Sequence, residues 1–189
     1  MTNKINQNLI SSLINNNDKV LDIGCGNGDL LYYLEKTKNI QGQGIEISHL
    51  GVKESVTKGL SVIQGDADED LVSFTDNTFD VVILSDTLQA THKPKEVLKQ
   101  MLRIGKKCII CIPNFGYWKY RLQILFYGIM PVTKTLSEPW YSTPNIHLCT
   151  IKDFINLCNS LNIEINKEYR NTQNNIKKIQ KPNSYLNNL

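Results

Sequence analysis

The chain has 189 residues, 41% of them hydrophobic and 21% charged, a length that suits one domain with a two-faced core and is short for two. No apolar run reaches the roughly 20 residues that span a membrane, and the first residues lack the apolar core of a signal peptide, so we expect no membrane partner. The five cysteines are an odd set in apolar segments, which favours reduced thiols in a cytoplasmic protein over a disulfide framework.

The formal net charge of +3 equals the charge of residues 164–189, which hold five Lys or Arg residues against Glu164 and Glu168. The rest of the chain is therefore neutral. A basic end is compatible with nucleic acid or an acidic partner, but such a charge run is more often a solvated surface. We interpret it as solvated and expect no nucleic-acid partner.

Hydrophobic spacing predicts the elements of the first part of the chain. Ile5, Leu9 and Leu13 recur every four residues and indicate a leading amphipathic helix. A short apolar strand over residues 20–23 runs into a glycine-rich loop over residues 24–28, and a helix with a leucine face follows. Further strands are expected at residues 42–47, 60–63, 79–84 and 108–112, with intervening helices at about residues 48–58 and 97–102.

Strands that alternate with helices in this way predict an α/β fold with a doubly wound, mostly parallel sheet. Such sheets bind ligands outside the carboxyl ends of their strands. We therefore expect the residues that follow the first four strands to converge on one edge of the sheet: the loop over residues 24–28, Glu46, Asp66 and the pair Ser85 and Asp86.

Pro113 opens a long aromatic-rich stretch that reaches about His147 without a regular period. A connection of this length in a compact domain is usually functional. Two interpretations stay open: a lid packed by its own aromatic side chains, and a docking surface for a partner, where Trp and Tyr are enriched.

The last part of the chain contains a capping box at Thr150 and Asp153, which predicts a helix with Phe154, Leu157 and Leu161 on one face. One more strand is expected over residues 163–169. Residues 171–189 are rich in Asn, Lys and Gln, so we expect a poorly ordered tail after a single domain over residues 1–170.

Three glycines, Gly24, Gly26 and Gly28, alternate where the first strand turns into a helix. Glycine there permits left-handed backbone angles and close approach of a ligand, and the helix N-terminus offers free N–H groups. The spacing departs from the G-x-G-x-x-G of dinucleotide sites, and no Gly-Lys-Ser/Thr follows for a triphosphate. A nicotinamide cofactor therefore remains a weaker alternative.

Three carboxylates near this loop favour a different ligand. Glu46 suits an acceptor for both hydroxyls of a ribose, Asp66 an acceptor for an adenine amino group, and Asp22 a partner for an ammonium group. A ribose and an ammonium without phosphate favour S-adenosylmethionine. The alternative is that these are solvated acids at strand ends. A binding site explains better why all three are expected near the glycine loop.

The glycine loop, Glu46 and the Gly65-Asp66-Ala67 loop are similar to motifs I to III of class I S-adenosylmethionine-dependent methyltransferases. More closely, the chain resembles the MetW family of methionine-biosynthesis proteins over residues 19–165. The most specific matches are residues 85–90, 113–118, 130–133 and 140–150.

This resemblance implies a cytoplasmic bacterial protein that accompanies homoserine O-acyltransferase and supports its activity. By motif matching it assigns S-adenosylmethionine binding to Asp22, Gly24, Gly26, Glu46 and Asp66, and we add their neighbours Gly28, Ile47, Ala67 and Ser85. It assigns no catalytic residue. Methyl transfer to a small molecule therefore stays open as the rival function, with Asp86, His92, Tyr141 and His147 as possible bases.

Two further expectations concern the strand over residues 108–112. Cys108 and Cys111 have the spacing of a metal pair, but residues three apart on a strand point to opposite faces, so we expect no metal site.

Class I methyltransferase folds usually end in a hairpin whose last strand lies between strands five and six. Residues 184–189 resemble only the approach to that strand, so we expect it to be missing and the sheet edge to be open.

Overall fold

The computed structural model describes residues 4–133, 138–172 and 175–179. The chain divides into two compact units, Met1–Ile112 and Pro113–Leu189. This differs from the single domain that we expected over residues 1–170. The physical reason is that the described residues after Pro113 add no strand to the sheet of the first unit.

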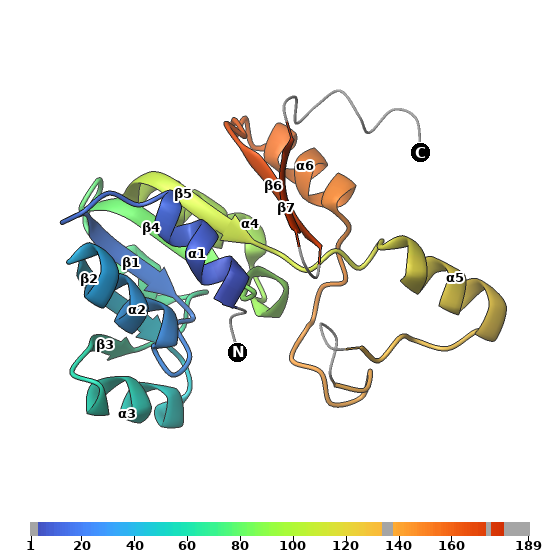
Figure 1. Cartoon of the computed structure of the whole chain (residues 1–189), viewed down its shortest axis with the longest axis horizontal. Coiled ribbons are helices and arrows are strands. Elements are labelled where there is room, and N and C mark those ends of the chain that lie inside the picture. Colours follow the sequence, from blue (N-terminus) through green and yellow to red (C-terminus); the bar gives the residue numbers. More distant parts are fainter. Residues whose placement is uncertain (1–3, 134–137, 173–174, 180–189) are drawn as a thin grey trace. The chain divides into compact units, whose positions relative to one another are not determined.

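The first unit is built on a five-stranded sheet with the order β3-β2-β1-β4-β5. All neighbouring strands run parallel, which confirms the predicted doubly wound α/β fold (Figure 1). The strands are β1 (Lys19–Ile23), β2 (Gln41–Glu46), β3 (Ser61–Gln64), β4 (Phe79–Ser85) and β5 (Gly105–Cys111). In the part of the chain that the structure describes, β5 forms one end of this sheet.

Helices connect these strands, as the alternating pattern predicts. They are α2 (Asp29–Lys38), α3 (His49–Thr57) and α4 (Pro94–Ile104), with single 3₁₀ turns η1 (Asp70–Ser73) between β3 and β4 and η2 (Leu88–Ala90) before α4. Helix α1 (Lys4–Ser12) precedes β1. Ser48 caps α3 by accepting from the Gly51 amide, and Pro94 opens α4 in the first turn, where its missing N–H is harmless.

The central strands are covered on both faces, as a parallel sheet requires. Side chains of β1 and β4 that point to opposite faces, such as Val82 and Ile83, are both fully buried. Ile83 belongs to a core cluster with Ile10 of α1 and Leu31 of α2, and Met101 of α4 is also fully buried. The strand ends are thereby held on a rigid base.

The second unit contains α5 (Trp118–Tyr127), α6 (Ile151–Ser160) and an antiparallel hairpin of β6 (Glu168–Thr172) and β7 (Asn175–Ile179). The predicted capping box is confirmed, because Thr150 Oγ1 accepts from the Asp153 amide and Asp153 accepts from the Thr150 amide.

From residue 171 onward we expected a poorly ordered tail, whereas the described residues up to Ile179 belong to this hairpin. Its ladder pairs main-chain groups from Glu168↔Ile179 to Thr172↔Asn175, and such pairing needs no apolar composition. Residues 184–189, where we expected the approach to a last strand, lie outside the described residues. Within the described residues no helix is long and apolar enough to cross a membrane.

Candidate functional site

The glycine loop after β1 is tied to the neighbouring strand β2. The amide of Gly24 donates to the Ile45 carbonyl at 2.8 Å, and Gly24 has a φ of 69°. A Cβ at this position would lie 2.5 Å from Thr87 Oγ1, which is closer than side chains tolerate. Gly24 is therefore required by backbone conformation and by the close approach of the segment after β4.

The other two glycines of the loop differ from each other in their surroundings. Both have positive φ, 57° for Gly26 and 76° for Gly28. A Cβ at Gly26 would meet no atom within 4 Å, whereas a Cβ at Gly28 would lie 2.4 Å from Leu60 Cδ1. The loop thus leaves open space above Gly26, and Gly28 is packed into the fold at the start of α2.

Glu46 lies at the end of β2 and is buried, with 8% of its surface exposed. Its Oε2 accepts from the Gly26 amide and its Oε1 accepts from the Ser48 amide, each at 2.8 Å. An ionised carboxylate has about four acceptor sites, so each oxygen keeps a lone pair for another donor. The two backbone contacts fix the carboxylate beside the open space at Gly26.

Asp22, near the end of β1, is 2% exposed. Burial, and secondarily the negative charge of Glu46, raises the pKa of its carboxyl group to about 7. Two acidic groups in one buried region create an environment that favours a cation. The effect of the Glu46 charge on Asp22 means that the two carboxyl groups lie near each other at the ends of β1 and β2.

The loop after β3 also reaches this edge. The Gly65 amide donates to the Glu46 carbonyl at 3.0 Å, so Asp66 and Ala67 follow directly from a residue bonded to the end of β2. Asp66 Oδ1 accepts from the Asp68 amide at 2.8 Å, and both Asp66 and Ala67 are half-buried. On the other side of Glu46, the apolar side chain of Ile47 is 65% exposed.

The end of β4 contributes a strained turn. Asp86 has a φ of 54°, an unusual conformation for a residue other than glycine, and its amide donates to the Cys111 carbonyl at 3.0 Å. The Ser85 hydroxyl oxygen is buried and has no hydrogen-bond partner among the described residues. Partial burial raises the pKa of the Asp86 carboxyl group. Strained residues of this kind cluster at functional sites.

Helix α3 supports the glycine loop, and the sequence patterns did not reveal these contacts. Ser55, which is fully buried, donates its hydroxyl to the Gly26 carbonyl at 3.1 Å. Lys58 donates to the Asn27 carbonyl at 2.6 Å, and Gly51 leaves room for the loop, since a Cβ there would lie 2.8 Å from the Gly26 carbonyl oxygen. Gly51 and Ser55 are small residues four positions apart on α3, but this spacing alone does not say what that side of the helix contacts.

Of the four possible bases, Asp86 follows the end of β4 directly, at the edge where the other candidate residues gather. His92 is exposed in the loop before α4, and its amide donates to Asp68. Tyr141 and His147 are exposed residues of the second unit. The geometry therefore brings the predicted binding residues to one edge of the sheet, and among the described residues it does not assemble a catalytic pair.

These residues fit a ligand with a cation and a ribose. Open space adjoins Gly26, the fixed Glu46 carboxylate retains acceptor capacity, and the Asp22 carboxyl group lies in the same buried acidic region. No basic side chain of the glycine loop is available to pair with a phosphate, since residues 24–28 contain none. The donor and acceptor set thus suits S-adenosylmethionine better than a dinucleotide.

Comparison with known proteins assigns the family. The family model described as "Methionine biosynthesis protein MetW" matches residues 4–189. The chain belongs to the MetW family. This confirms the resemblance noted in the sequence and assigns the chain to a family of methionine-biosynthesis proteins.

The MetW-family chain is similar to curated relatives of more than one kind. It is 33% identical over 177 residues to a bifunctional methionine biosynthesis protein MetXA/MetW from Rhodopirellula baltica, a match that covers 89% of this chain and 28% of the relative. It is 30% identical over 128 residues to a demethylmenaquinone methyltransferase from Listeria welshimeri, covering 60% of this chain and 53% of the relative. The MetW-family chain thus spans only part of the length of each.

Solved structures agree on the fold. The YcgJ protein of Bacillus subtilis matches with a TM-score of 0.64 and 14% identity, over 90% of this chain and 71% of that one. A SAM-dependent methyltransferase from Archaeoglobus fulgidus matches with a TM-score of 0.60 and 19% identity, over 87% and 70% of the two chains. The MetW-family chain therefore has the class I methyltransferase fold.

Proposed function

We propose that this chain supports the activity of homoserine O-acyltransferase in methionine biosynthesis and binds S-adenosylmethionine at the edge formed by Gly26 and Glu46. The observation that carries the first part is the relative from Rhodopirellula baltica, whose single polypeptide is named as a bifunctional methionine biosynthesis protein, MetXA/MetW. The chain matches 28% of that relative, which leaves most of its length for the acyltransferase.

The ligand-binding part of the proposal rests on the nine residues at the sheet edge. Glu46 would accept from the ribose hydroxyls, and Asp66 and Ala67 would lie toward the adenine, with the exposed apolar surface of Ile47 beside it. Asp22 would balance the ammonium group through water or the adjacent backbone, and Gly26 provides the open space. Gly24 and Gly28 would keep the loop close to Thr87 and Leu60 around that space, and Ser85 would lie at the end of β4, where it pairs with Cys111.

S-adenosylmethionine is a downstream product of methionine, so its binding here would supply a feedback signal to the acyltransferase. No catalytic residue is needed for that role, which agrees with the lack of an assembled catalytic pair at the described site. The effector would act through its different affinity for the free and partner-bound chain.

Size-exclusion chromatography of the full chain mixed with homoserine O-acyltransferase from the same organism tests the partner. The proposal expects one peak that contains both proteins in a fixed ratio. Separate elution of the two proteins at micromolar concentration, each of them folded, would overturn it.

A second candidate function is methyl transfer to a small molecule, which the similarity to demethylmenaquinone methyltransferases favours. Bound S-adenosylmethionine would supply a transferable methyl group, and Asp86, with its raised pKa, is the residue of this chain best placed to accept a proton from an acceptor. Incubation with methyl-labelled S-adenosylmethionine and a metabolite extract tests it. Label in a small molecule supports the enzyme, and label that stays in the cofactor excludes it for that extract.

A further inference from the structure

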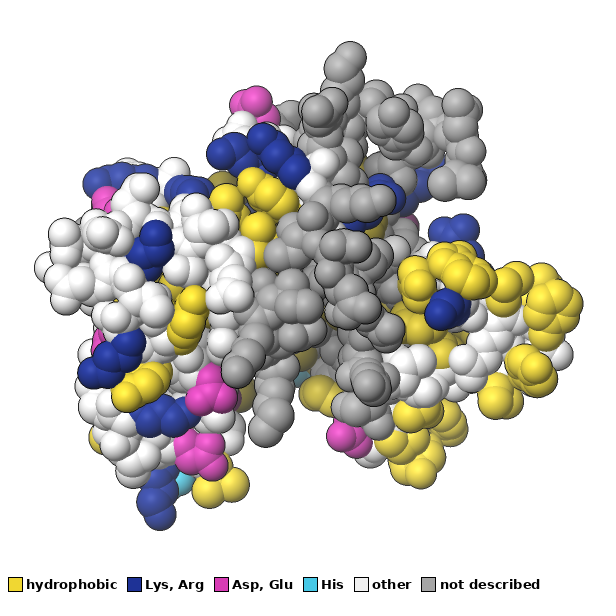
Figure 2. Space-filling model, in the orientation of Figure 1, with side chains coloured by type: hydrophobic (Ala, Val, Ile, Leu, Met, Phe, Trp, Pro, Cys, Tyr) yellow, Lys and Arg dark blue, Asp and Glu magenta, His cyan; other side chains and the backbone are white. Residues whose placement is uncertain are grey.

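Helix α5 consists mostly of apolar and aromatic residues, although it is exposed to solvent. Its sequence is Trp-Lys-Tyr-Arg-Leu-Gln-Ile-Leu-Phe-Tyr, with apolar or aromatic side chains on all sides, and none of the ten residues in this described helix is buried. Leu125, Phe126 and Tyr127 are 73–75% exposed. Figure 2 shows hydrophobic side chains gathered over this helix. A helix that is apolar all round is normally buried, whereas the side chains of α5 are not buried by the described residues.

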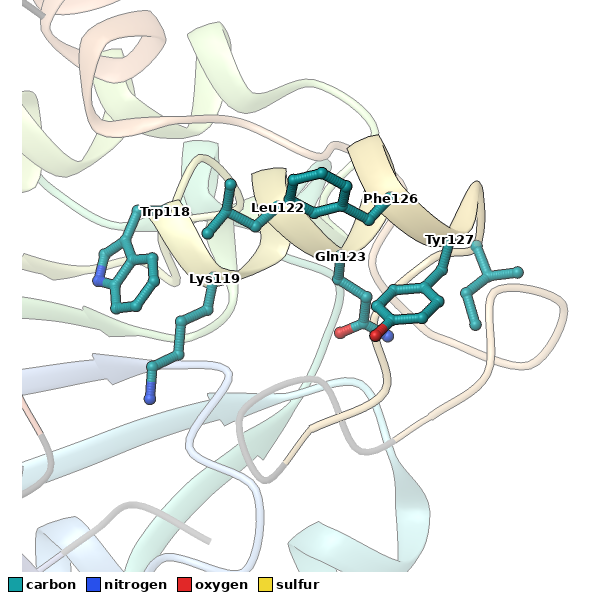
Figure 3. A pocket seen from close by; sticks show the side chains of 7 residues that line it. Trp118, Lys119, Leu122, Gln123, Phe126 and Tyr127 are labelled. Carbon is teal, nitrogen blue, oxygen red and sulfur yellow. The ribbon is translucent and has the colours of Figure 1, made fainter.

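The surface of α5 is hollowed along one side. A shallow depression of about 510 Å³ is lined by two rows of side chains four residues apart, and by Ile129 after the helix. The rows are Trp118, Leu122 and Phe126, and Lys119, Gln123 and Tyr127 (Figure 3). Rows of this spacing form the ridges of a helix, and the groove between two ridges receives a ridge of a second helix.

The charge of this helix indicates the chemistry of what covers it. Lys119 and Arg121 are its charged residues, and α5 contains no Asp or Glu. Lys119 Nζ lies 5.5 Å from the centre of the Trp118 ring, so the charge sits at the margin of the apolar groove. A fitting partner therefore presents an apolar ridge with carboxylates beside it.

A second copy of this chain is a poor match for that description. A two-fold pairing of α5 with itself would place Lys119 and Arg121 in the same interface as their own copies, and like charges at an interface are unfavourable. The relative from Rhodopirellula baltica supplies the better occupant, because MetXA and MetW lie on one polypeptide there and are held at high effective concentration.

We propose that the groove of α5, lined by Trp118, Leu122, Phe126, Lys119, Gln123 and Tyr127, is the docking site for an apolar helix of homoserine O-acyltransferase with acidic residues at its edge. This inference rests on the proposed function and adds the surface through which it operates. The exposed Met130 and Val132, which follow the helix, extend the same apolar surface.

The affinity of the full chain for the acyltransferase tests this surface. The double variant Leu122→Ala/Phe126→Ala removes one row of the groove and keeps helix propensity, because alanine is the best helix former. We expect the dissociation constant to rise at least tenfold. Val72→Ala/Leu102→Ala, which removes exposed apolar side chains from the first unit, is the matched control and should change it less than twofold.

A charge variant provides an independent measurement. Lys119→Glu reverses a charge at the margin of the groove, so it should slow association and flatten or reverse its dependence on salt. Far-UV circular dichroism and S-adenosylmethionine affinity should be unchanged in both α5 variants. A double variant that has lost its fold leaves Lys119→Glu as the deciding variant.

The outcomes separate the two proposals. If the wild-type chain does not bind the acyltransferase, the proposed function fails and the docking site fails with it. If the wild type binds and both α5 variants bind equally well, the docking site is overturned and the proposed function stands. If the double variant abolishes self-association of the chain but leaves acyltransferase binding unchanged, the groove is an interface between copies, which also overturns the inference.

Discussion

The amide of Gly26 donates a hydrogen bond of 2.8 Å to Glu46 Oε2, and this contact joins the loop after β1 to the end of β2. The other oxygen of Glu46 accepts from the Ser48 amide, so the carboxylate is held at both ends. The position of Glu46 is therefore set before any ligand arrives, which reduces the ordering cost of binding.

Replacing Glu46 by Gln should separate the ligand-binding role from the structural one. Glutamine has one side-chain oxygen, so either the Gly26 or the Ser48 amide loses its acceptor, and the negative charge is lost. We expect S-adenosylmethionine affinity, measured by calorimetry, to fall at least tenfold, since bonds to charged groups contribute about 1.5–3 kcal/mol each. Glu54→Gln, an exposed change on α3, is the control. Equal affinities for the two variants would contradict this role of Glu46.

Gly26→Ala should abolish ligand binding with a small loss of stability. A Cβ there meets no protein atom within 4 Å, so the cost to the fold is the left-handed backbone angle, about 1–2 kcal/mol. Gly59→Ala is a matched control, because Gly59 also has a positive φ, 81°, and open space around it. Thermal unfolding should report similar losses for both variants. Calorimetry should report lost affinity for Gly26→Ala alone, and retained affinity in that variant would show that the ligand does not use this space.

Asp22 should make folding stability depend on pH. Its folded pKa of about 7 lies above the ordinary value of 3.8 for an aspartate, so the folded state binds more protons between these two pH values. The free energy of unfolding should therefore fall as pH rises from about 4 to 7, by at most about 1.4 kcal/mol per pH unit. Asp22→Asn removes the ionisation, so urea unfolding of this variant should lack that part of the slope and show higher stability than the wild type at pH 8. A wild-type slope that the variant retains would assign the effect to another group.

Asp22 should also make ligand binding depend on pH. A bound ammonium group favours the ionised form of Asp22, so binding near pH 6 must first release its proton. We expect S-adenosylmethionine affinity to rise from pH 5.5 to 7, with proton release detectable as a buffer-dependent binding enthalpy. Affinity that is independent of pH over this range would argue against a cation beside Asp22.

Trp140 should matter for the partner and not for the ligand. Its side chain is 74% exposed and packs edge-on against Tyr141 with 5.7 Å between ring centres, which leaves most of both rings in water. We expect Trp140→Ala to weaken activation of the acyltransferase by tenfold or more in half-maximal concentration, with unchanged S-adenosylmethionine affinity. Loss of ligand affinity instead would favour the lid interpretation of this segment.

The positions of the sheet strands follow closely from the sequence, because a strand buried on both faces reads as a continuous apolar run. Residues 79–84 were predicted and β4 spans Phe79–Ser85. The start of β5 was missed, since Gly105 and Lys107 lack apolar side chains while their main chain pairs with β4. Helix α5 was also missed. Its apolar residues lie on all sides of the helix, so the sequence shows no amphipathic period there.

The sequence indicates the candidate site residues one at a time but not the contacts between them. Gly26 follows one predicted strand and Glu46 lies near the end of another, yet their hydrogen bond joins residues 20 positions apart. Ser55 could not be predicted as a support for the glycine loop, since that role depends on how α3 packs over the loop. The type of side chain at a strand end can be read from the local sequence, whereas the contacts that hold that side chain in place depend on tertiary packing.

The rate of homoserine O-acyltransferase, measured with and without the full chain at matched concentrations, tests the central claim most directly. We predict that the rate rises several-fold and saturates at a fixed molar ratio of the two proteins. An active acyltransferase whose rate stays unchanged over a large excess of the folded chain would contradict the account.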